Sequence, residues 1–128
     1  SYTVPAARGG SAARGTFVLS GSGESTAGGK THRERIVRFG DTSPEGLRDK
    51  VAAVMSEMER RLKLLGFSWA EALATQAYTV QNIGHLVGEA IAARGACTGG
   101  LAWTYAWPPI VDLEYEMDVR SVARELVI

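Results

Sequence analysis

Four carboxylates alternate with apolar residues near the C-terminus of the chain. Successive side chains of a strand point to opposite faces of a sheet, so all four carboxylates are predicted to share one face: Asp112, Glu114, Glu116 and Asp118. The other face then carries Leu113, Tyr115, Met117 and Val119. Two interpretations remain open, a half-buried strand with a solvated acidic face, or a cleft in which one carboxylate acts as a general acid/base. Partial burial would raise the pKa of such a carboxyl toward neutrality, which suits proton transfer.

A second alternating segment, residues 101–107, is rich in aromatic residues. Trp103, Tyr105 and Trp107 are predicted to project to one side of a strand, with small residues on the other. Packing in a core or a subunit interface would explain such a row. The alternative is one wall of a pocket for a flat, conjugated ligand. If the row points away from the helices, we expect a second subunit to cover it.

Two arginines and the single cysteine are further candidates for a role in chemistry. Arg33 and Arg35 are two residues apart on a predicted strand, so they would face the same side, either on a solvated edge or binding a substrate carboxylate. The single cysteine, Cys97, is predicted to be a small buried residue rather than a nucleophile. With two histidines and none of the common phosphate-loop, metal-binding or nucleophile-elbow motifs, we expect no metal and no cofactor.

The elements that position these residues follow from periodicity and capping. Residues 44–65 are predicted to form an amphipathic helix, because apolar residues recur every three or four positions: Leu47, Val51, Val54, Met55, Met58, Leu62 and Leu65. Ser43 is its predicted N-cap and Gly66 its stop. A second helix is predicted at 83–94, a capped turn at 68–71, and strands at 16–20, 34–39, 72–80, 101–107 and 111–119. This order predicts one α+β domain over residues 1–128, a mixed sheet with two helices packed on one face.

Composition excludes several classes of protein. The 128 residues carry 14 Lys+Arg and 14 Asp+Glu, so the formal net charge is zero and no excess positive field favours nucleic acid as a partner. The chain lacks the long apolar run that a membrane span needs, and it shows no secretory signal. We therefore expect a cytoplasmic protein with no membrane partner.

Several segments, taken in order, resemble the Rid superfamily of YjgF-like proteins. They are Arg-Gly-Thr-Phe-Val-Leu-Ser-Gly at 14–21, the long helix ending in Leu-Leu-Gly at 64–66, and the stretches 69–80 and 111–120. The resemblance covers about residues 11–120. It implies a chorismate-mutase-like fold, homotrimers with ligand clefts between subunits, and hydrolysis of enamine or imine intermediates to keto acids and ammonia. Other members bind small ligands without known catalysis, and some have been described as endoribonucleases; zero net charge and the lack of a catalytic histidine pair disfavour RNA cleavage here.

The resemblance also implies roles for particular residues. Ser20-Gly21 would line the cleft and Glu114 would place the attacking water, whereas the arginine with which active deaminases bind a substrate carboxylate falls at Gly99. A branch that lacks this arginine resembles 2-aminomuconate deaminases, and the stretches 69–80 and 107–120 look closest to it.

The leading hypothesis is therefore hydrolytic deamination of a small enamine or imine acid, similar to 2-aminomuconate, with Glu114 as the catalytic residue. The expected substrate-binding residues are Ser20, Gly21, Gly99, Trp103, Tyr105, Arg33 and Arg35. The alternative hypothesis is a non-catalytic module that uses the same cleft to bind a small carboxylate-bearing metabolite.

Overall fold

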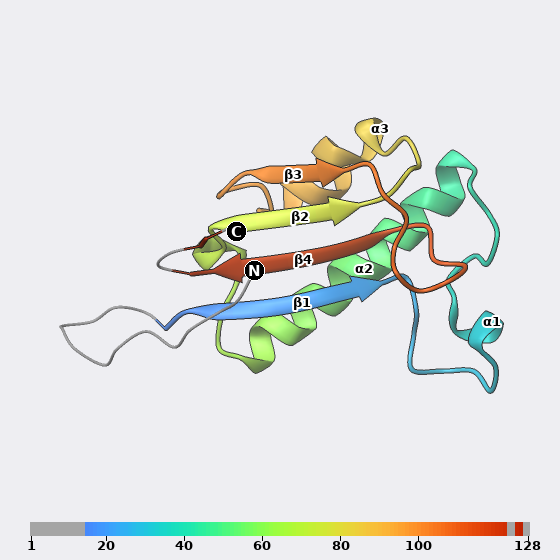
Figure 1. Cartoon of the computed structure of the whole chain (residues 1–128), viewed down its shortest axis with the longest axis horizontal. Helices are drawn as coiled ribbons and strands as arrows, with labels where there is room; N and C mark the ends of the chain where they lie inside the picture. Colours follow the sequence, from blue (N-terminus) through green and yellow to red (C-terminus); the bar gives the residue numbers. More distant parts are fainter. Residues whose placement is uncertain (1–14, 123–124, 127–128) are drawn as a thin grey trace.

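The computed structural model describes residues 15–122, 125 and 126, which build one mixed sheet with helices behind it (Figure 1). In this part of the chain the sheet has four strands in the order β1-β4-β2-β3. They span Phe17–Gly23 (β1), Glu116–Ser121 (β4), Ala74–Tyr78 (β2) and Leu101–Thr104 (β3). β4 is antiparallel to both β1 and β2, and β2 is parallel to β3. The predicted α+β class is confirmed.

The long helix α2, Pro44–Leu64, matches its prediction because its ends and its apolar face are encoded locally. Ser43 Oγ accepts a hydrogen bond from the Gly46 amide at 3.1 Å, which caps the first turn. Gly66 adopts a left-handed φ of 79°, and the Phe67 amide donates to Leu62 O at 2.9 Å, which closes the last turn. Leu65, placed on the apolar stripe by its spacing, is 51% exposed because it lies beyond the last helical residue.

The sheet has a buried face and an open face. Its buried side chains pack with α2 and the segment that follows β2: Phe17, Leu19, Thr75, Ala77, Met117 and Val119. The open face, as we use the term, carries the residues that alternate with them: Val18, Gln76, Tyr78, Glu116, Asp118 and Arg120. The helices pack on the buried face, because six inward-facing side chains from three strands are removed from water there.

The second helical region occupies the predicted place but is not one regular helix. It consists of α3 at Gly84–Leu86, a π-helical turn at Val87–Ile91 and a 3-10 turn at Ala92–Arg94. Leu86 and Ile91 are both fully buried although they are five residues apart. The wider π turn brings residues at this spacing to the same side, where an α-helical turn would not.

The prediction of a strand at 34–39 is wrong. A short helix, α1 at His32–Arg35, takes its place, and only an isolated bridge joins Ile36 to Ser25. Thr31 Oγ1 accepts from the Glu34 amide at 3.3 Å, and the Glu34 carboxylate accepts from the Thr31 amide at 3.2 Å. This reciprocal capping box satisfies the local backbone and outweighs the β preference of Ile36, Val37 and Phe39.

β3 and β4 are shorter than the strands predicted for them. β3 ends at Thr104, four residues before the Pro108-Pro109 break. β4 begins at Glu116, because the amides of Glu114 and Tyr115 donate to the side chain of Glu24 instead of to a neighbouring strand. Asp112 has a left-handed φ of 71°, which extended backbone does not adopt.

Candidate functional site

Glu114 lies just before β4, at the end of the sheet where β1, β2 and β3 finish. Three bonds hold it. Its amide donates to Glu24 Oε1 at 2.6 Å, its carbonyl accepts from Thr79 Oγ1 at 2.6 Å, and its Oε2 accepts from Gln81 Nε2 at 2.8 Å. The side chain is half-buried. A carboxylate fixed at backbone and side chain, yet open to a small molecule, has the geometry that a general base requires.

The acidic row contains three residues of the predicted four. Glu114, Glu116 and Asp118 are half-buried and share one face, and the alternating residues from Leu113 to Val119 are buried as predicted. Asp112 does not belong to the row, because its backbone turns before the strand and its side chain lies 3.9 Å from His32 Nε2.

Glu116 is both partly buried and close to other carboxylates. Burial, together with the charges of Asp118 and Glu24, raises the pKa of the Glu116 carboxyl above its usual value. Asp118 accepts a hydrogen bond from the Tyr78 hydroxyl at 2.9 Å. Burial and this carboxylate raise the pKa of Tyr78 to about 12, so the hydroxyl stays protonated and remains a donor.

Ser20 and Gly21 form a bulge in β1. The pairing with β4 passes from Leu19–Val119 to Ser22–Met117, so two residues of β1 stand opposite Asp118 alone. A side chain at Gly21 would overlap the Glu116 carboxylate, which occupies that space. The bulge and the acidic row are therefore in direct contact.

Trp103 and Glu114 are linked through Thr79, with which each of them forms a hydrogen bond. Its indole Nε1 donates to the carbonyl of Thr79 at 3.1 Å, and the hydroxyl of Thr79 contacts the carbonyl of Glu114. Trp103 shares the side of β3 that carries Leu101, which packs on the core, so it does not point away from the helices. Tyr105 and Trp107 lie beyond the end of β3 and are 78% and 61% exposed. The aromatic row predicted for one long strand is thus split.

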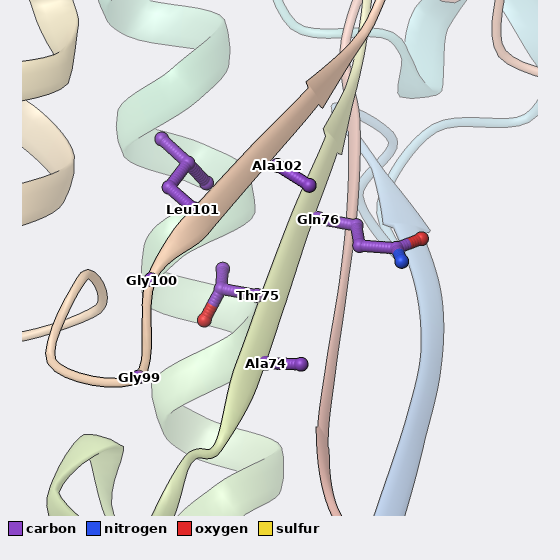
Figure 2. Close-up of a pocket in the computed structure, with 7 residues that line it drawn as sticks. All are labelled: Ala74, Thr75, Gln76, Gly99, Gly100, Leu101 and Ala102. Atoms are coloured by element: carbon purple, nitrogen blue, oxygen red, sulfur yellow. The ribbon is translucent and has the colours of Figure 1, made fainter. Parts of the chain in front are cut away.

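Gly99 lies at the other end of the sheet, beside a pocket of about 280 Å³. Figure 2 shows this pocket at the start of β2 and β3, where Gly99, Gly100 and Leu101 line it with Thr75 and three other residues. Gly99 precedes β3 and Glu114 precedes β4 at the other end of the sheet, so about the length of β2 separates them, about 13 Å at 3.3 Å per residue. Among the predicted site residues, Gly99 therefore lies at the opposite end of the sheet from Glu114, and the residues Ser20 and Gly21 lie between the two ends, opposite Asp118.

The backbone explains the absence of a side chain at residue 99. A Cβ placed on Gly99 would lie 2.5 Å from the carbonyl oxygens of both Ala72 and Leu73. Backbone atoms cannot rotate aside as a flexible side chain does. An arginine at this position is therefore incompatible with the local packing.

Arg33 and Arg35 are exposed residues of α1 rather than neighbours on a strand. The Arg33 guanidinium stacks on the Phe39 ring at 4.2 Å, and Arg35 Nε donates to Gly29 O at 3.3 Å. α1 is tied to the segment before β4, since His32 Nε2 lies within hydrogen-bond distance, 2.9 Å, of Val111 O. Neither arginine contacts the 280 Å³ pocket.

Sequence reasoning missed the three residues that hold Glu114, which are Thr79, Gln81 and Glu24, and it also missed Lys50, which pairs with Glu24. Lys50 left a signal, because it falls on the apolar stripe of α2 between Leu47 and Val51 and is fully buried. The partner of Lys50, Glu24, gave no comparable signal, because it follows a run of small polar residues that is typical of a loop.

No cluster of three or more potential metal ligands occurs among the residues that the structure describes. A second hollow, of about 690 Å³, lies between the end of β1 and α2 and contains none of the predicted site residues. In the described part of the chain, no helix combines the length and apolar character needed to cross a bilayer.

Replacing Cys97 by Ser or Ala is expected to change any turnover by no more than a fewfold. Burial raises the pKa of the Cys97 thiol, which lowers the fraction of reactive thiolate at neutral pH. The residue packs against the core instead. Steady-state rates of the two variants test this, and complete loss of turnover with unchanged circular dichroism would restore Cys97 as a nucleophile.

The fold defined by these elements is that of the Rid proteins. RidA from the Antarctic bacterium Psychrobacter sp. PAMC 21119 superposes with a TM-score of 0.62 over 92% of each chain at 14% identity. The YjgF gene product from E. coli gives 0.60 over 97% of this chain and 89% of its own, also at 14% identity. A protein from Entamoeba histolytica described as a putative endoribonuclease L-PSP gives 0.61 at 18% identity, over 94% and 98%.

The sequence narrows the class further. Residues 1–126 match the family model of the 2-aminomuconate deaminase CnbZ, and the chain belongs to this family. It is 57% identical over all 128 residues to a 2-amino-5-chloromuconate deaminase from Comamonas testosteroni. The chain spans half the length of that relative. The resemblance to the branch of 2-aminomuconate deaminases is confirmed.

Proposed function

We propose that this chain provides a site for the hydrolytic deamination of a small conjugated amino acid of the 2-aminomuconate type. Membership of the 2-aminomuconate deaminase family is the observation that carries the proposal. The geometry around Glu114 supports it, since the half-buried carboxylate accepts from Gln81 and the backbone carbonyl of Glu114 is linked to Trp103 through Thr79.

In the proposed reaction the enamine first becomes its protonated imine tautomer. Glu114 takes a proton from water as the water oxygen bonds to the imine carbon, giving a neutral carbinolamine. Glu114 then gives this proton to the nitrogen, the C–N bond breaks with its electron pair on nitrogen, and Glu114 takes the hydroxyl proton as the C–O bond becomes a carbonyl. One water is consumed and one ammonia is released, with no net oxidation. Ser20, Gly21, Trp103 and Tyr105 would line the substrate.

The substrate carboxylates need a cationic partner other than an arginine at position 99. Arg33 and Arg35 remain the proposed partners, because their helix is linked to the segment before Glu114 through His32 and Val111. A planar guanidinium fits a carboxylate with two parallel hydrogen bonds.

The direct test is to follow ammonia release and loss of the conjugated absorbance of 2-aminomuconate with the purified chain. We expect one ammonia to be released for each substrate consumed, without an initial burst and at a rate proportional to the enzyme concentration. Absence of turnover on 2-aminomuconate and on simpler enamine acids would contradict the proposal.

The alternative is a non-catalytic module that binds a small carboxylate-bearing metabolite. The packing of Gly99 on the carbonyls of Ala72 and Leu73 favours it, because this packing excludes the arginine of the active deaminases. Calorimetric binding of a dicarboxylate, with no ammonia released from any enamine, would favour the module.

We also propose that the chain forms a homotrimer with its cleft between subunits. Gly99 and Glu114 lie at opposite ends of one sheet, so a single chain does not bring all of the predicted site residues together. Four exposed apolar residues also lie between the end of β3 and the start of β4, after the exposed Trp103 of β3: Tyr105, Trp107, Ile110 and Val111. Such exposure is typical of an interface.

Light scattering is expected to give three times the mass of one chain, independent of concentration in the micromolar range. A stable monomer would contradict both the trimer and the shared cleft.

A further inference from the structure

An ion pair is completely buried beside Glu114. Lys50 of α2 and Glu24, which follows β1, are both 0% exposed, and Lys50 Nζ lies 3.2 Å from Glu24 Oε1. Lys50 Nζ also donates to the carbonyl of Val37 at 2.9 Å. The pair therefore joins the end of β1, the helix α2 and the segment between α1 and α2.

Both oxygens of Glu24 also accept from the backbone that carries the proposed base. Oε1 accepts from the Glu114 amide at 2.6 Å and Oε2 from the Tyr115 amide at 3.0 Å. These two residues lie outside β4, so the strand ladder does not fix them. Glu24 fixes them instead, because the two oxygens of its carboxylate accept hydrogen bonds from two successive backbone amides.

Stability alone gives little reason for this arrangement. Removing two charges from water is costly, and well-packed apolar residues commonly stabilise a core as well as a buried ion pair does. An apolar residue at position 24 would not accept the amides of residues 114 and 115. Without Lys50, the charge of Glu24 would be uncompensated next to the acidic row. Its influence there is already visible, since it is one of the charges that raise the pKa of Glu116.

We infer that Glu24 and Lys50 are positioning residues, a buried clamp that sets the direction in which the Glu114 carboxylate enters the site. This inference rests on the proposed role of Glu114. Glu24 orients the backbone on the amino side of the Glu114 side chain, while Thr79 and Gln81 hold its carbonyl and its carboxylate. Lys50 neutralises the clamp and does not touch the substrate.

The experiment compares Glu24→Gln, Lys50→Met and the double variant. Each single variant leaves one buried charge without its partner and is expected to melt at a lower temperature. The double variant removes both charges at similar volume, so its melting temperature is expected to recover toward that of the wild type. Gln at position 24 offers one acceptor oxygen for two amides, so the position of Glu114 is not expected to recover.

Three readouts separate positioning from a purely structural role. In the double variant, kcat on 2-aminomuconate is expected to remain about 10-fold or more below wild type with KM changed less than about 3-fold, because a displaced catalytic group lowers the rate steeply. Amide hydrogen exchange at Glu114 and Tyr115 is expected to be about 10-fold or more faster, with Met117 and Val119 unchanged.

Arg48→Met is the matched control. Arg48 lies on α2, as Lys50 does, and the substitution breaks its exposed ion pair with Glu89. It is expected to change none of these readouts.

Recovery of kcat together with the melting temperature, and exchange at Glu114 and Tyr115 as slow as in the wild type, would overturn the inference. If the wild type does not turn over 2-aminomuconate, the proposed function fails. The exchange measurement then still decides the clamp, because faster exchange confined to Glu114 and Tyr115 supports it and unchanged exchange refutes it.

Discussion

Glu114→Gln is expected to lower deaminase turnover by about 10²-fold or more, which is the usual cost of removing a general acid/base. The amide has the shape of the carboxylate and still offers an oxygen to Gln81, which donates to Glu114 Oε2 at 2.8 Å. It cannot accept a proton from water. The variant should therefore fold as the wild type does and bind substrate with a similar KM. Ammonia release under saturating substrate, with a thermal melt as the control for folding, measures the effect.

Glu116→Gln is the matched comparison, because Glu116 is the next carboxylate on the same face. It is expected to cost far less, since Glu116 lies over Gly21 whereas Glu114 is held by Gln81 and lies nearer to Trp103. The raised pKa of Glu116 nevertheless gives this carboxyl a proton affinity that suits catalysis. If Glu116→Gln abolishes turnover while Glu114→Gln retains it, the proton-transfer role belongs to Glu116.

Gly99→Ala is expected to lower the free energy of unfolding by about 1–3 kcal/mol, the usual cost of overpacking. The new methyl group would stand 2.5 Å from two carbonyl oxygens, so the backbone of Ala72 and Leu73 or the turn itself must move. Gly88→Ala is the matched control, because a Cβ there meets nothing within 4 Å. Urea denaturation of the two variants and the wild type measures the difference.

Gly99→Arg should also be destabilised, and it should not acquire hydrolysis of simple amino-acid imines. A Gly99→Arg variant with wild-type stability that hydrolyses such imines would show that the turn accommodates an arginine, and that our explanation for its absence is wrong.

The elements that the sequence predicted well are those whose signals are local. α2 has its cap, its apolar stripe and its glycine stop within its own residues, and the alternation from Leu113 to Val119 predicted the buried face of β4. The segment 34–39 failed because two hydrogen bonds between Thr31 and Glu34 outweighed the strand preference. The π turn was missed because Leu86 and Ile91, five apart, fit no standard helical period.

The candidate site was predictable only in part, because its contacts join distant residues. The alternating acidic segment left four carboxylates as candidates, and the resemblance to the Rid superfamily singled out Glu114 among them. The acceptor for its amide is 90 residues earlier in the chain, and the partner of that acceptor, Lys50, is 26 residues beyond it. Alternation and capping act over a few residues, so they give no information about such pairings. The split of the aromatic residues depended in the same way on where β3 ends.

The bulge at Ser20-Gly21 has a consequence for the whole chain beyond it, because it reverses the parity of β1. Before the bulge the odd-numbered residues Phe17 and Leu19 point toward the helices. After it Ser22, paired with Met117, points inward, so the next even-numbered residue, Glu24, is directed toward Lys50. If β1 paired with β4 without the bulge, Ser20 would stand opposite Asp118 and Gly21 opposite Met117, so Ser22 and Glu24 would turn to the outer side and Ser25 inward. The two-against-one pairing at Asp118 thus determines whether the carboxylate that holds Glu114 is inside the protein at all.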